Sequence, residues 1–111
     1  ATKEEINTRA AALATREAVR AECDRRIEAA VPTPLHRNLM AAVTAILVSV
    51  AIDPKSLTSE QEADLTDFRT LQDWLARMVA NAADLDGDRS YTDDASWPEF
   101  PGELEAFMRK F

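Results

Sequence analysis

Hydrophobic and polar residues recur at helical spacing over most of the chain, and the most apolar segment is residues 35–52. From Leu39 to Ile52 no residue is charged, although charged residues make up 30% of the chain. The β-branched residues of this segment favour a strand, whereas its length and its alanines favour a helix. Pro34 suits the first turn of a helix, and Pro54 disfavours its continuation. The pattern therefore predicts a helix over residues 35–52.

This helix carries two neighbouring apolar stripes, so we expect it to be buried on most sides and to need at least two neighbours. The stripes consist of Leu39, Val43, Ile46 and Val50, and of Met40, Leu47 and Ala51. The uncharged run is shorter than the roughly 20 apolar residues that cross a bilayer. It also lies inside the chain, whereas a signal peptide lies at the start. We therefore predict a core helix and no membrane contact.

Residues 59–83 show the clearest helical periodicity in the chain. Apolar residues recur there at spacings of three and four, at Leu65, Phe68, Leu71, Leu75, Met78, Val79 and Ala82. Thr58 or Ser59 can cap this helix, with Gln61 or Glu62 at the third helical position. The connecting loop is short, so this helix should pack antiparallel on the core helix.

Residues 3–30 form a predicted long helix whose apolar face is thin. Thr2 and Glu5 make a capping-box pattern at its start. Ile6, Ala10, Leu13, Ile27 and Val31 lie near one line, which Glu17, Arg20 and Asp24 interrupt. Two interpretations follow: a solvated helix with one edge on the core, or an arm that completes its burial against another subunit. Isolated helices gain little stability from propensity, so we expect contacts outside the subunit.

The arm interpretation sets the predicted domain organisation. Pro32 and Pro34 form a hinge between an extended N-terminal helical arm, residues 1–31, and a compact helical domain, residues 32–111, which should fold without the arm. The predicted partner contacts are Ile6, Leu13, Arg20, Ile27, His36, Arg37 and Asn38. For the last three, the other interpretation is that they are ordinary polar residues at the beginning of a helix.

Residues 84–101 are irregular and acidic, and Pro101 begins a short last helix. Tyr91, Trp97 and Phe100 are spaced as anchors that hold the acidic loop to the helices. The predicted fold class is therefore all-α. It has three main helices, at about 3–30, 35–52 and 59–83, plus the acidic loop and a short C-terminal helix.

The net charge of −7 is concentrated in one part of the chain. Residues 81–105 carry eight acidic side chains and one basic side chain, whereas residues 1–80 carry 12 and 10. Binding to DNA or RNA phosphates needs the opposite sign of charge. The pattern indicates no nucleic-acid partner and suits a basic protein surface or a cation.

One pattern in the acidic loop is a candidate binding site for a metal ion. An EF-hand loop places oxygen ligands at fixed positions around a glycine at the sixth. With Gly87 in that place, the candidate calcium ligands are Asp84, Asp86, Asp88, Ser90 and Asp93. Ala82 then occupies the first ligand position and Arg89 an ordinarily apolar one, and Asp-Gly is also common turn chemistry. We adopt a solvated acidic turn and assign no metal, with a calcium site as the alternative.

Nothing in the chain forms a recognised catalytic motif. His36 is the one histidine, without the further ligands of a zinc site. Neither a Gly-x-Ser-x-Gly elbow nor a glycine-rich phosphate loop is present. Cys23 is predicted to be a surface or edge thiol. We therefore expect no enzymatic activity, no cofactor and no small-molecule substrate.

The stretch Arg26-Ile27-Glu28-Ala29-Ala30-Val31-Pro32, followed by Leu35-His36-Arg37-Asn38-Leu39, resembles a family of phage proteins. Small tail-associated proteins of double-stranded DNA bacteriophages often have an Ala/Glu/Arg-rich helix, a proline and an Arg/Asn-containing start of an apolar helix. The resemblance covers roughly residues 3–50. It implies a structural or assembly role in the virion, or in the host cytoplasm during assembly. The implied partners are copies of the chain or neighbouring virion proteins, with no cofactor.

Two other functions remain open at this point. The first alternative is a small acidic binding module or inhibitor that occupies a basic surface of a partner protein. The second is a calcium-binding helical module.

Overall fold

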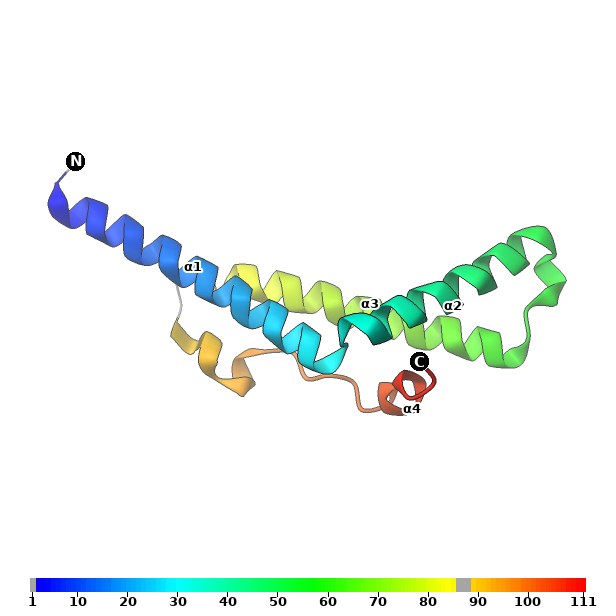
Figure 1. Cartoon of the computed structure of the whole chain (residues 1–111). Coiled ribbons are helices and arrows are strands. Elements are labelled where there is room, and N and C mark those ends of the chain that lie inside the picture. The colour runs from blue at the N-terminus through cyan, green and yellow to red at the C-terminus, as the bar shows by residue number, and fades with distance from the viewer. Residues whose placement is uncertain (1, 86–88) are drawn as a thin grey trace.

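The computed structural model describes residues 2–85 and 89–111, and of the side chains in residues 3–14 and 89 it describes none. Within these residues the fold is all-α, without strands, as predicted (Figure 1). The helices are α1 (Lys3–Ala30), α2 (Thr33–Ile52), α3 (Ser59–Asp84) and α4 (Leu104–Met108), and short 3₁₀ turns cover Pro54–Ser56, Arg89–Thr92 and Asp94–Ser96.

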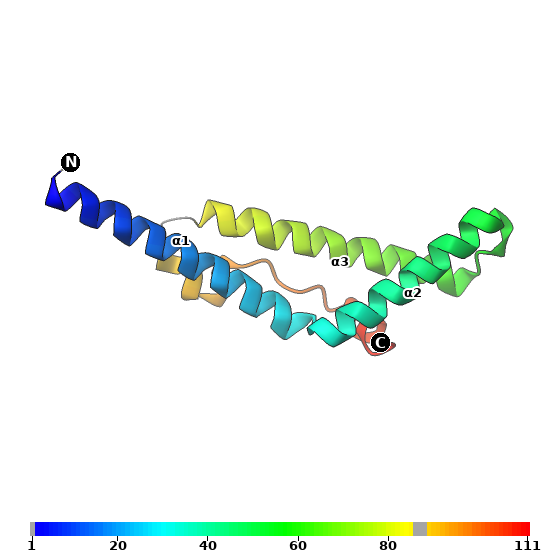
Figure 2. The same ribbon diagram turned by 45° about the horizontal axis from the view of Figure 1, so that its top comes forward.

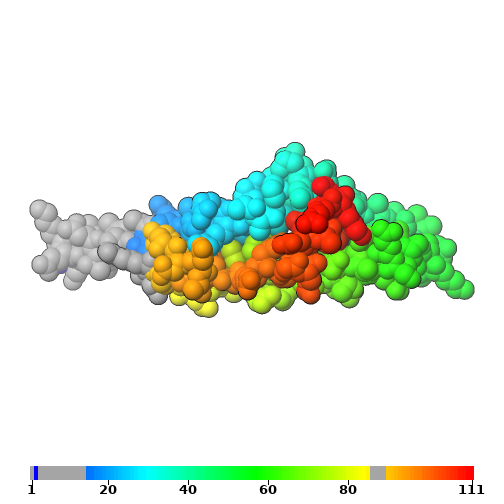
Figure 3. Space-filling model, turned by 90° about the horizontal axis from the view of Figure 1, so that it is seen from below, coloured from blue at the N-terminus to red at the C-terminus, as the bar shows by residue number. Residues whose placement is uncertain are grey.

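The molecule is elongated, with extents of 66 × 27 × 21 Å. Helices α1 and α2 follow one another with a bend between them, and α3 runs back alongside both (Figures 1 and 2). The predicted antiparallel packing of α3 on α2 is therefore confirmed, and α3 packs on α1 as well. Seen from below, the C-terminal segment lies along the underside of these helices (Figure 3).

Local contacts between residues close in the sequence determine where the helices begin and end. Thr58 and Gln61 form the predicted capping box, because the Gln61 backbone N–H donates to the Thr58 hydroxyl at 3.1 Å and the Thr58 N–H donates to the Gln61 side chain at 3.0 Å. Pro34 lies in the first turn of α2, as predicted. The Asp53 carboxylate accepts from the Lys55 N–H at 3.1 Å, which turns the chain from α2 towards α3.

The largest cluster of buried residues draws on all four helices and the acidic loop. Its members are Val19, Cys23, Val31, Leu39, Leu71, Trp74, Met78, Trp97, Leu104, Phe107 and Met108. The expectation of a thinly buried α1 is thus wrong for its C-terminal half. The core spans the expected boundary between arm and compact domain, because α1 lies against α3 instead of reaching away from it.

Cys23 corrects a second expectation, because it is buried and not a surface thiol. Its S–H donates to the backbone oxygen of Met78 at 3.7 Å. Burial raises the pKa of this thiol, and the charge of Asp24 raises it further. A protonated buried thiol is a poor nucleophile, so Cys23 acts here as a small apolar residue that joins α1 to α3.

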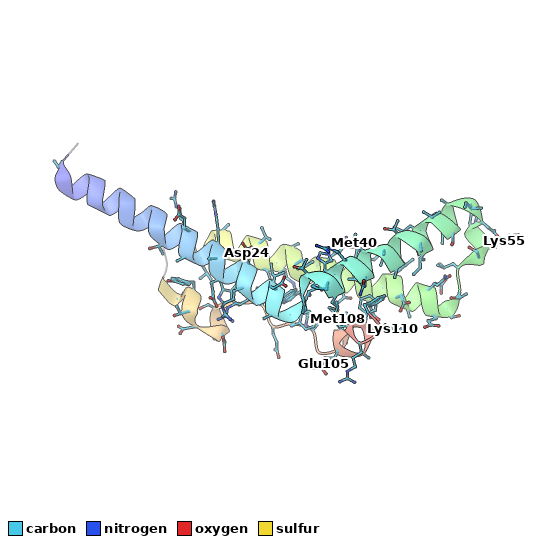
Figure 4. All side chains as sticks on the ribbon, in the orientation of Figure 1. Asp24, Met40, Lys55, Glu105, Met108 and Lys110 are labelled. Carbon is cyan, nitrogen blue, oxygen red and sulfur yellow. The ribbon has the colours of Figure 1, made fainter. Side chains whose placement is uncertain are left out.

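The aromatic residues of the acidic loop hold it to the helices, as predicted. Trp97 is buried, and its indole N–H donates to the backbone oxygen of Tyr91 at 2.7 Å. Trp74 of α3 donates to the Pro98 oxygen at 3.2 Å and meets the Phe100 ring edge to face, with centroids 4.9 Å apart. The C-terminal turn is tied to α3 as well, because Lys110 contacts Asp64 at 2.7 Å (Figure 4).

Candidate interaction surface

Helix α2 is not buried on most sides, which corrects the central expectation about it. Its buried residues are Leu39, Val43 and Ile46. The large apolar side chains Met40, Leu47, Val48 and Ile52 are 41%, 54%, 53% and 82% exposed. The physical reason is the course of α1, which ends where α2 begins and does not fold back along it (Figure 1). Helix α2 therefore has α3 as its main neighbour and a free side opposite.

We call this free side the outer face of α2. It consists of Arg37, Ala41, Thr44, Ala45, Val48 and Ile52, all of which are exposed. Their spacing of three and four places them in one stripe, opposite the buried stripe of the same helix. The stripe contains no charged residue after Arg37, and no charge follows until Asp53, just beyond the helix.

Large exposed apolar side chains lie in or beside both halves of the outer face. Towards the N-terminal end Ala41, Thr44 and Ala45 are small, with the exposed Met40 beside them. Towards the C-terminal end the side chains are large, at Val48 and Ile52, with the exposed Leu47 beside them. Exposed apolar side chains therefore accompany the outer face along its whole length.

One charged residue, Arg37, lies in the outer face, and another, Asp53, follows the end of the helix. Arg37 is exposed and forms no ion pair with any residue that the structure describes. Asp53 is exposed as well, and its carboxylate holds the turn after the helix. Lys55 lies further out, at the far end of the helical hairpin formed by α2 and α3 (Figure 4).

Helix α2 is also long and apolar enough to cross a membrane, by length and composition only, and it is alone in this among the described residues. The expectation that it is too short counted the uncharged run, whereas the helix begins at Thr33 and has 20 residues. Buried residues make up 17% of its most apolar stretch. The length of α2 therefore does not exclude a membrane-spanning position.

The predicted partner-contact residues divide into three groups. Ile6 and Leu13 lie outside the described side chains. Ile27 packs against the buried cluster, so it does not face outwards, and His36 is half-buried. Arg20, Arg37 and Asn38 are exposed, and Arg37 begins the outer face of α2. The residues that sequence reasoning missed are Ala41, Thr44, Ala45, Val48 and Ile52.

The missed residues had a signal in the sequence. A helix without charge around its whole circumference carries more apolar surface than one neighbour covers. The sequence predicts at least two neighbours for this helix, and the bend after α1 leaves it with α3 as its main neighbour.

The calcium candidate stays a prediction. Asp86 and Asp88 lie outside the described residues. Asp84 and Asp93 are exposed, and Ser90 is half-buried, with its backbone oxygen accepting from the Asp93 N–H at 2.9 Å. Within the described part of the chain, no three His, Cys, Asp or Glu side chains are grouped to hold a metal ion.

A groove of about 870 Å³ runs between α1 and the acidic loop, lined in part by Arg26, Trp97 and Phe100. Arg26 contacts Glu22 at 2.8 Å and Asp94 at 2.9 Å, and its guanidinium lies 5.5 Å from the centre of the Trp97 ring. Arg25 also binds Glu22 and, with Arg26, holds the pKa of that carboxyl below its ordinary value. These cations are already neutralised, so the groove joins loop to helix and does not form an anion site.

Comparison with models of protein families, with curated proteins and with solved structures finds no match.

Proposed function

We propose that this protein is a non-enzymatic structural or assembly protein that acts by helix packing, with the outer face of α2 as its contact surface. The observation that carries the proposal is the exposure of an uncharged helical stripe from Ala41 to Ile52, about three turns long. The resemblance to phage tail-associated proteins supports a role as a virion or tail component.

The exposed apolar side chains of α2 favour association with another protein, because burying them lowers the free energy. Removing apolar surface from water contributes about 25 cal/mol per Å², and monomeric proteins rarely expose contiguous apolar patches above a few hundred Å². Val48 and Ile52, with Leu47 beside them, are three large apolar side chains exposed close together on one helix. Covering these side chains would therefore favour association.

The acidic binding module is the second candidate, and one observation favours it. Asp93, Glu99, Glu103 and Glu105 follow one another along the C-terminal segment, and all four are exposed. None of them forms an ion pair with a described residue. A basic partner surface would neutralise this segment, but it would leave the outer face of α2 uncovered.

The proposal is tested by co-expressing the chain with the proteins encoded beside its gene. Val48→Glu places a charge in the outer face, and Ala80→Glu places the same charge at an exposed position of α3. We expect size-exclusion chromatography to show assembly for the intact chain and for Ala80→Glu, and its loss for Val48→Glu. Assembly that survives Val48→Glu contradicts the proposal and favours the acidic segment.

A further inference from the structure

We draw no further inference here: the strongest candidate, the exposed apolar outer face of α2, already serves as the contact surface of the proposed function, and nothing in the structure shows which partner covers it.

Discussion

Glu28 near the end of α1 accepts two hydrogen bonds from Thr33 at the start of α2, from the backbone N–H at 2.9 Å and from the hydroxyl at 2.7 Å. The carboxylate thereby spans the bend at Val31 and Pro32 and satisfies a free N–H of the new helix. This contact helps to fix the direction in which α2 leaves α1. That direction leaves the outer face of α2 free.

The bend should respond to pH through Glu28. The bond from the Thr33 backbone, and then that from its hydroxyl, lower the pKa of this carboxyl from its ordinary value of 4.5. A lowered folded-state pKa stabilises the fold above the ordinary value, and that contribution is lost as pH falls through the folded-state pKa. Glu28→Gln should therefore lower the melting temperature at pH 7 and have a smaller effect near about pH 3.

The control for this prediction is Glu17→Gln, an exposed position on the same helix. It should change the melting temperature little at either pH. An equal effect of Glu28→Gln at both pH values would contradict the role given to the two bonds.

Two leucines of α2 provide a matched pair for its one-sided burial. Leu39 is fully buried and Leu47 is 54% exposed. Leu39→Ala should cost about 2–5 kcal/mol of unfolding free energy, because it leaves a cavity. Leu47→Ala should cost less than about 1 kcal/mol in the monomer. Urea denaturation at low protein concentration measures both, and equal costs would mean that α2 is covered on both sides within one chain.

The C-terminal half of α1 should be indispensable for folding. Removing residues 1–30 deletes Val19 and Cys23 from the buried cluster, so we expect loss of the cooperative thermal transition. Removing residues 1–14 leaves both in place and should preserve the transition. A truncation to residues 31–111 that melts cooperatively, as circular dichroism would show, contradicts this assignment and restores the separable arm.

The helices were predictable because residues close together in the sequence determine where each helix begins and ends. Pro34, the Thr58–Gln61 capping box and the apolar periodicity of α3 each act within a few residues. The burial of α1 was harder to predict from the sequence, because Val19 and Cys23 lie off the line through Ile6 and Leu13. Cysteine is among the most often buried residue types, so a signal was present.

The candidate surface could not be derived in the same way. Apolar residues on every side of α2 indicate that it must be covered, but not whether the cover comes from the same chain. The answer depends on the angle at Pro32, which arises from contacts between Glu28 and Thr33 and from the packing of α1 on α3. These contacts join different helices, and the pattern of apolar and polar residues along the sequence does not reveal them.

The most direct measurement of the central claim uses a photo-crosslinking amino acid at Val48 in the assembled protein. The same probe at Ala80 on α3 is the control, since both positions are exposed in the single chain. We expect irradiation to join the Val48 probe to a second protein chain in high yield, and the Ala80 probe to give only background. Equal yields from both positions, or no crosslink at Val48 under conditions where the protein assembles, would contradict the assignment of the outer face of α2 as the contact surface.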